Sequence, residues 1–138
     1  PQISIRELEE DEFDTFAEIY TNGFQMPSFL KSGVAQNNKI LHNNPNWTFY
    51  LASVDNVPAG VGVLFIKDRI ATLAAAATLP SLRKKGIQSA LIKKRIQQAS
   101  FEECCLIAVQ AKFGSTSQTN MEKAGMKIAY TKAIWVKK

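Results

Sequence analysis

The sequence contains few of the residues on which metal sites and disulfide frameworks depend. Among its 138 residues there are two cysteines, adjacent at Cys104 and Cys105, and a single histidine, His42. Adjacent cysteines rarely form a disulfide, because on a strand they point to opposite faces. With so few ligands we expect no metal site. We expect both cysteines to be buried structural thiols in a reducing, cytoplasmic setting.

Long hydrophobic runs are also missing. The most apolar segment, residues 70–79, is far shorter than a membrane span and is explained by a buried strand, so no membrane partner is expected. The chain is acidic rather than apolar up to Asp14, which argues against a signal peptide. Its length fits one domain, and because it begins at Pro1 we expect residues 1–138 to be part of a longer chain.

The charge is distributed unevenly along the chain. Residues 1–66 carry three basic and eight acidic side chains, whereas residues 67–138 carry fourteen basic and four acidic ones, which gives net charges of −5 and +10. A basic half indicates a polyanionic partner, either a nucleic acid or a nucleotide cofactor. No helix-turn-helix, RNP or zinc pattern occurs, so a nucleic-acid partner is not expected.

Hydrophobic periodicity predicts interspersed strands and helices. Strands are expected at 3–8, 47–54, 57–66, 70–79 and 104–110, with a last strand or hairpin at 126–136; helices are expected at 11–23, 27–37, 87–100 and from Ser115 to Gly125. Residues 37–46, rich in asparagine, are expected to form a loop. Arg95 falls inside the apolar arc of its helix, and we expect its charged end to extend out to solvent.

This order of elements predicts an α+β or α/β domain with a mixed sheet flanked by helices. The phosphate-binding patterns G-x-G-x-x-G and G-x-x-x-x-G-K-[ST] are both missing, which excludes a doubly wound dinucleotide-binding unit and a P-loop NTPase.

The most informative segment is Thr78-Leu79-Pro80-Ser81-Leu82-Arg83-Lys84-Lys85-Gly86-Ile87-Gln88-Ser89. A strand leads through a short basic turn into an amphipathic helix. The first N–H groups of a helix have no partner inside it, and the helix dipole adds partial positive charge there. Gly86 allows close approach of the backbone, and Arg83, Lys84 and Lys85 add full charges. Such a turn is typical of an anion-binding site.

This segment also resembles the pyrophosphate loop of the GNAT N-acetyltransferase superfamily, whose pattern is Arg/Gln-x-x-Gly-x-Gly/Ala. Arg83 and Gly86 match the pattern, and Gln88 stands where the family has a small residue. The resemblance implies a single GNAT-like acetyltransferase domain over residues 1–138. It would have a mixed, mostly antiparallel twisted sheet flanked by helices, and acetyl-CoA as its co-substrate.

The resemblance also assigns candidate site residues. Ala76, Ala77 and Thr78 would line the acyl-CoA cleft, with the Thr78 backbone positioning the thioester; alternatively, the alanines are small because a helix packs closely on them. The pyrophosphate loop would comprise Arg83, Lys84, Lys85, Gly86, Ile87, Gln88 and Ser89. Ser117 and Asn120 would contact the pantetheine or adenine side, although Ser117 also fits a helix cap.

One residue departs from the family pattern. Many members carry a tyrosine general acid four residues before the closing glycine, and here that position is Met121. The proton for the leaving thiolate would then come from Tyr130, from Tyr50 or from water. No cysteine or serine has an activating base nearby in sequence, so no covalent intermediate is expected.

The expected function is therefore direct transfer of an acetyl group to a primary amine of a small molecule or a protein. The acceptor pocket is expected in the first third of the chain, with Tyr20, Phe24, Gln25 and Phe29 as candidates. A homodimer is one candidate assembly. The alternative is a non-catalytic, CoA-binding regulatory domain of a larger protein, which Met121 and Pro1 favour.

Overall fold

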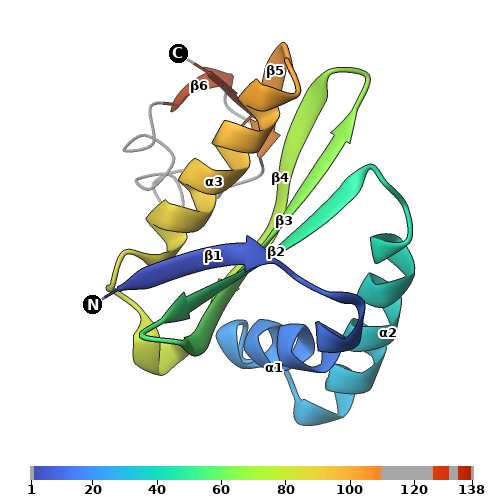
Figure 1. Cartoon of the computed structure of the whole chain (residues 1–138), viewed down its shortest axis with the longest axis vertical. Helices are drawn as coiled ribbons and strands as arrows, with labels where there is room; N and C mark the ends of the chain where they lie inside the picture. The colour runs from blue at the N-terminus through green and yellow to red at the C-terminus, as the bar shows by residue number, and fades with distance from the viewer. Residues whose placement is uncertain (1, 110–125, 131–133, 138) are drawn as a thin grey trace.

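A twisted five-stranded sheet forms the centre of the molecule (Figure 1). The computed structural model describes residues 2–109, 126–130 and 134–137. The strands lie side by side in the order β1 (Ile3–Glu7), β2 (Trp47–Val54), β3 (Val57–Lys67), β4 (Ile70–Thr78) and β5 (Leu106–Val109). β1 to β4 pair antiparallel, and β5 is parallel to β4. The mixed, mostly antiparallel sheet expected from the sequence is confirmed.

Tight turns connect the three central strands. Asp55 and Asn56, and again Asp68 and Arg69, all have φ between 50° and 70°. Positive φ at both central residues is the type I′ geometry, whose twist matches that of the strands it joins. The N–H of Cys105 donates to the Arg69 carbonyl at 2.8 Å, which ties the second turn to the start of β5.

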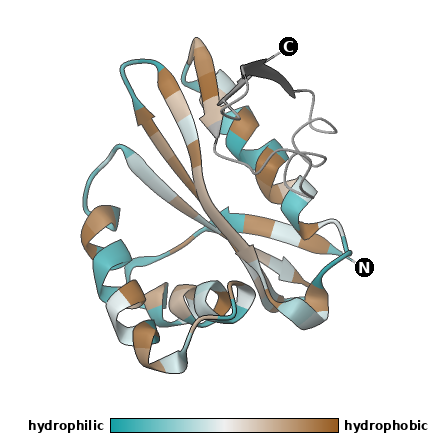
Figure 2. Cartoon of the chain, turned by 180° about the vertical axis from the view of Figure 1, so that it is seen from behind, coloured by the Kyte–Doolittle hydropathy of each residue, from teal (hydrophilic) through white to brown (hydrophobic). Residues whose placement is uncertain are grey.

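Helices cover the sheet on both faces (Figure 1). α1 (Phe13–Gly23) and α2 (Lys31–His42) lie on one face, and α3 (Ile87–Phe101) lies on the other. Short 3₁₀ turns at Glu10–Glu12, Ser28–Leu30 and Pro80–Leu82 precede these helices. Hydrophobic residues follow the strands, and hydrophilic residues gather at the turns (Figure 2).

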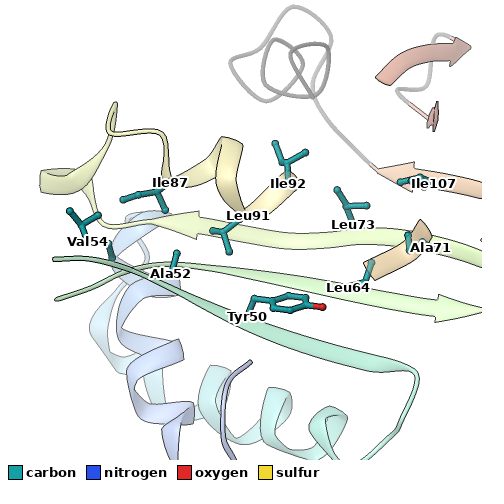
Figure 3. Close-up of a cluster of buried hydrophobic side chains, with 12 residues drawn as sticks. Tyr50, Ala52, Val54, Leu64, Ala71, Leu73, Ile87, Leu91, Ile92 and Ile107 are labelled. Atoms are coloured by element: carbon teal, nitrogen blue, oxygen red, sulfur yellow. The ribbon is translucent and has the colours of Figure 1, made fainter. Parts of the chain in front are cut away.

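The core is divided by the sheet into two clusters. On the α1 side, Phe13, Phe16 and Ala17 pack on the sheet as their helical spacing predicts. On the α3 side, Ile87, Leu91 and Ile92 belong to one buried cluster with side chains of the strands, and Leu91 points toward the sheet (Figure 3). Burial of a side chain of this size contributes about 1.5–3 kcal/mol. Packing on both faces fixes the sheet, and with it the position of the β4 end.

α2 differs from the prediction. It extends to His42, so the asparagine-rich residues expected in a loop are partly helical. Val34 and Leu41, seven residues apart, pack on the α1-side cluster, and Asn38 between them donates to the Val34 carbonyl at 2.8 Å. The asparagine content favoured a loop, but the apolar spacing of Val34 and Leu41 places one face of this segment on the core, and the segment is helical.

Two further predictions about side chains were wrong. Arg95 does not reach solvent: it is only 1% exposed. Cys105 is exposed and Cys104 only half-buried, so they are not the buried thiols expected, and both are free. The chain turns from α3 into β5 at this point, which leaves Cys105 at the surface.

β6 (Met126–Tyr130) and β7 (Ile134–Lys137) form an antiparallel pair, so of the two forms expected at the end of the chain, a last strand or a hairpin, the structure has the paired one, and β7 lies beside β5. The helix expected from Ser115 to Gly125 lies outside the described residues. In the part of the chain that is described, no helix is long and apolar enough to cross a membrane.

Candidate functional site

The described pairing of β4 with β5 covers only the first half of β4. Its pairing with β5 covers Ile70 to Leu73 and ends at Val109, the last residue of β5. Directly after Leu73 the register with β3 shifts, because Gly62 is opposite Ala76 whereas Leu64 is opposite Leu73. Ala74 and Ala75 therefore share a single partner, Val63. Such a β-bulge bends the strand and increases its twist.

In the described ladder, the second half of β4 pairs with β3 alone. Ala76, Ala77 and Thr78 continue to pair with β3, but in the described ladder none of them pairs with β5. Among the described residues, the backbone groups on that side of Ala76, Ala77 and Thr78 therefore have no strand partner, and this stretch is called the open edge of β4. The candidate cleft residues taken from the sequence lie on this open edge.

The end of α1 closes one side of this region. A Cβ at Gly23 would lie 2.9 Å from the Ala77 Cβ and 3.0 Å from the Thr78 carbonyl oxygen, so only a glycine allows so close a contact. Close helix packing, the alternative reason for a small residue, therefore does apply at Ala77. The sequence indicated Gly23 only as a helix stop; its contact with β4 had no signal in the sequence.

The turn after β4 presents positive charge to solvent. Arg83, Lys84 and Lys85 are exposed, and both Lys84 (φ 65°) and Gly86 (φ 83°) are left-handed. A left-handed lysine is uncommon because its Cβ crowds the following carbonyl. The conformation of this turn therefore does not follow from residue preference alone.

The first turn of α3 has free backbone donors. Its first hydrogen bond runs from the Ala90 N–H to the Gly86 carbonyl at 3.0 Å, and no side chain caps the helix. Among the described residues, the N–H groups of Ile87, Gln88 and Ser89 have no partner. These three donors lie next to the exposed cations, at the turn for which the sequence predicts anion binding.

Two side chains of this turn make specific contacts. Arg83 donates from Nη2 to the Gly23 carbonyl at 2.6 Å, which links the loop to the end of α1. Gln88 donates from Nε2 to the Thr78 hydroxyl at 2.6 Å, and Thr78 is 6% exposed. Gln88 is thus turned inward onto the open edge of β4, and with this hydroxyl as its acceptor it joins the helix to the strand.

The remaining candidate residues lie elsewhere. Ser117, Asn120 and Met121 fall outside the described residues. Tyr130 is the last residue of β6, and the structure describes only its backbone. Tyr50 is 1% exposed in the α3-side core, where burial, together with the charges of Glu7 and Glu102, raises its pKa to about 12.

Neither the histidine nor the cysteines are arranged for nucleophilic catalysis. The ring of His42 packs on those of Phe13 and Phe49, and its centroid lies 5.3 Å from the Phe13 centroid and 6.2 Å from the Phe49 centroid. Burial raises the pKa of Cys104, and the nearby charge of Glu102 raises it further, so its reactive thiolate is disfavoured. Within residues 2–109, 126–130 and 134–137, no group of three or more metal-ligating side chains comes together.

The acidic residues of the first third gather away from the open edge of β4. Arg6 pairs with Glu12 through two hydrogen bonds of 2.7 and 2.6 Å before α1 begins. Gly23 is at the other end of this eleven-residue helix, about 16 Å from its start near Glu12. A groove of about 460 Å³ between α1 and α2 is lined by Asp14, Ser28, Phe29, Lys31, Ser32, Ala35 and Gln36, none of which belongs to β4 or the loop.

Comparison with protein families identifies the class of protein that this fold and site define. Residues 5–124 match the Acetyltransferase (GNAT) family. The chain therefore belongs to the GNAT acetyltransferase family, and the family resemblance stated from the sequence is confirmed. No curated protein gives a significant sequence match.

Solved structures of acetyltransferases share the fold. The chain is similar to the PaiA N-acetyltransferase of Thermoplasma acidophilum in complex with coenzyme A, at 16% identity and a TM-score of 0.76, covering 99% of this chain and 97% of that one. It is also similar to the ribosomal-protein-S18-alanine N-acetyltransferase of Escherichia coli (15%, TM-score 0.76, 94% and 80% covered). The aminoglycoside acetyltransferase AAC(6')-Iy, solved with a bisubstrate analogue, gives a TM-score of 0.80 at 16% identity, with 95% of each chain covered.

Proposed function

We propose that residues 1–138 form one catalytic domain that transfers the acetyl group of acetyl-CoA directly to a primary amine of a small molecule or a protein. The observation that carries the proposal is the junction of the open β4 edge with the uncapped start of α3. The strand has an edge with no partner among the described residues, which suits an extended chain, and the helix start offers donors to an anion. Acetyl-CoA has both parts, a pantetheine arm and a pyrophosphate.

The loop and the first turn of α3 would hold the pyrophosphate. The N–H groups of Ile87, Gln88 and Ser89 would donate to its oxygens, and Arg83, Lys84 and Lys85 would supply charge. The left-handed Gly86 lets the backbone approach without a Cβ in the way. Ala76, Ala77 and Thr78 would pair with the pantetheine arm, and Ser117 and Asn120 would contact the same ligand.

The chemistry needs a polarised carbonyl and two proton transfers. A backbone N–H of the open β4 edge would donate to the thioester oxygen as negative charge develops there. The amine attacks the carbonyl carbon, the C–S bond breaks, the attacking nitrogen loses a proton to a base or water, and the thiolate gains one. Tyr130 is the proposed proton donor; Tyr50 is disfavoured, since it is buried with a raised pKa.

The acceptor is proposed to bind beside the end of α1. Gly23 contacts the end of β4, and the next residue, Phe24, is 50% exposed with its ring 4.8 Å from that of Tyr20. Residues 19–54 contain no carboxylate. An acceptor with an apolar or aromatic group near its amine therefore suits this surface better than a polycation does. We also propose a cytoplasmic location, with a homodimer as a candidate assembly.

A non-catalytic, CoA-binding regulatory domain is the second candidate. The observation that favours it is Met121, which stands where many family members have their general acid. In that case the protein binds CoA but turns over no amine. A steady-state assay separates the two.

The deciding experiment measures CoA release from acetyl-CoA with a panel of amines that includes aromatic amines, peptides and aminoglycosides. Amine-dependent release with formation of the N-acetyl product supports the proposal, and preference for aromatic amines supports the proposed acceptor surface. Tight CoA binding without release by any amine supports the regulatory domain. Failure to bind CoA refutes both.

A further inference from the structure

Arg95 is a fully buried cation without an acidic partner. It is 1% exposed, and no ion pair involves it among the described residues. Its guanidinium donates from Nε to the Leu91 carbonyl and from Nη1 to the Val63 carbonyl, each at 3.2 Å. Burial lowers the pKa of Arg95 to about 10, so it remains protonated at neutral pH. A buried charge is costly, and a hydrophobic residue of similar size is often as stable or more so.

The sheet makes room for this side chain at a glycine. A Cβ at Gly62 would lie 3.2 Å from Arg95 Nε and 3.3 Å from Cζ. Gly62 is opposite Tyr50 on β2 and Ala76 on β4. The guanidinium therefore lies directly over β3, beside the strand that carries the open edge.

The Val63 carbonyl faces β4 at the bulge. Val63 is opposite Phe49, whose carbonyl accepts a hydrogen bond from the Leu8 N–H on the far side of β2. Because backbone groups alternate along an antiparallel pair, the Val63 carbonyl points away from β2, toward β4. On that side Val63 is opposite two residues, Ala74 and Ala75. At such a bulge the regular ladder of backbone hydrogen bonds is disrupted.

We propose that Arg95 is a positioning residue that holds the β4 bulge, and through it the open edge on which the acyl-CoA arm binds. Its guanidinium supplies a fixed donor to the carbonyl that the bulge leaves irregularly paired. The described pairing of β4 with β5 reaches Leu73, next to the bulge that Arg95 holds, and the open edge begins directly after the bulge. The link to acyl-CoA rests on the proposed function.

The test compares two variants of Arg95 with one core control. Arg95→Met keeps the length of the side chain without its donors, and Arg95→Lys keeps a single donor group. Ile92→Ala is the control, because Ile92 is equally buried on α3 but touches neither Gly62 nor Val63 in any described contact. Each protein is measured for melting temperature, for CoA dissociation constant and for amide hydrogen exchange at residues 62–64 and 73–78 without ligand.

We expect Arg95→Met to fold with a melting temperature near that of the unchanged protein, yet to bind CoA about tenfold or more weakly, because displaced groups lose much of their binding. Amide hydrogen exchange at the bulge should differ between Arg95→Met and the unchanged protein. Arg95→Lys should recover part of the CoA affinity and part of the original exchange. Ile92→Ala should melt at a lower temperature but keep its CoA affinity within about twofold, as independent sites do.

Two results would overturn the inference. One is unchanged exchange at residues 73–78 in Arg95→Met. The other is a loss of CoA affinity that simply follows the melting temperature across all variants, Ile92→Ala included. If Arg95→Met does not fold, Arg95→Lys decides by the same two measurements. If the unchanged protein does not bind CoA, the proposed function fails, whereas the exchange at the bulge still tests Arg95.

Discussion

Gly86 is the residue at which backbone conformation and ligand approach coincide. Its φ is 83°, and it starts α3 at the proposed pyrophosphate site. We expect Gly86→Ala to lower the free energy of unfolding by about 1–2 kcal/mol, which is the cost of a left-handed residue with a Cβ. We also expect weaker CoA binding, measured by calorimetry.

The matched control is Gly33→Ala. Gly33 lies inside α2, and a Cβ there would meet nothing within 4 Å. This substitution should stabilise the protein by about 0.5–1 kcal/mol, because glycine is unfavourable inside a helix. It should leave CoA affinity unchanged. Equal effects of both substitutions on CoA binding would contradict the role given to Gly86.

Tyr130 is the proposed proton donor, and its test is the removal of one oxygen. We expect Tyr130→Phe to lower kcat by about 10²-fold or more, since a general acid contributes about 10²–10⁴-fold. CoA affinity should change little. Steady-state kinetics with the best amine of the panel provide the measurement. A Tyr130→Phe enzyme with undiminished kcat would assign protonation of the thiolate to water.

Glu12 gives the protein a specific response to acid. The hydrogen bonds from Arg6, and the N–H of Glu9, lower the pKa of Glu12 from 4.5 to about 2. A carboxyl whose pKa is lower in the folded state stabilises the fold above its unfolded pKa. This contribution is lost as the pH falls from about 4.5 to about 2. The Arg6 side chain is 54% exposed and that of Glu12 is 22% exposed, so solvent screens the pair and its value is less than about 1 kcal/mol.

We therefore expect Glu12→Gln to be slightly less stable than the unchanged protein at pH 7 and equally stable near pH 2. Urea unfolding at several pH values measures this difference. Glu10→Gln, in the same exposed turn but without a described side-chain contact, should show no such convergence. A stability difference for Glu12→Gln that does not vary with pH would argue against the ion pair.

At the scale of elements, the start of α3 packs closely against β3 at Gly60. A Cβ at Gly60 would lie 2.7 Å from Ile87 Cγ2 and 3.2 Å from the Ala77 carbonyl oxygen. We expect Gly60→Ala to move the start of α3 outward and to lower the free energy of unfolding by about 1–3 kcal/mol, as overpacking does. Because Ile87 belongs to the proposed pyrophosphate site, CoA affinity should fall as well.

Denaturant unfolding and CoA calorimetry on Gly60→Ala provide the measurement. The control is Ala99→Gly, a change at the far end of α3, where a buried methyl group is removed without crowding β3. It should lower stability but leave CoA affinity close to that of the unchanged protein. If Gly60→Ala binds CoA with unchanged affinity, the close contact of α3 with β3 at Gly60 does not determine CoA binding.

The sequence was sufficient to predict most elements and their order, because the strands alternate or are wholly apolar and glycines or Asp-Asn mark the turns. The bulge in β4 was not predicted. Nothing in a run of four alanines shows which two share one partner, since this depends on pairing with β3. The burial of Arg95 escaped prediction for a related reason. The glycine that admits it, Gly62, is 33 residues earlier in the sequence.

The loop was the part of the site most readily predicted, since its charges, glycine and helix start are contiguous in sequence. The contact of Gly23 with Thr78 and the bond from Arg83 to Gly23 join segments about 55–60 residues apart, and no local pattern encodes them.

At the scale of the whole molecule, ligand binding and stability are linked. A ligand that binds only the folded state, at 100 times its dissociation constant, adds about 2.7 kcal/mol. For a chain of this size that raises the melting temperature by roughly 5 °C or more. We expect CoA and acetyl-CoA to produce such a shift in a thermal melt, and adenosine without phosphate to produce none. A melt unaffected by millimolar CoA would contradict the proposed site.

The exposed run Arg83-Lys84-Lys85 also has a kinetic consequence. Most of the acidic side chains of the first 18 residues precede or begin α1, so the molecule carries its two signs of charge in different places. A highly anionic ligand diffusing nearby feels this field before it touches the protein, and its encounters are biased toward the basic end. Dissolved salt shortens the reach of that field to about 8 Å at physiological ionic strength. Capture of CoA should therefore slow as salt is added, while its departure, governed by short contacts, changes much less.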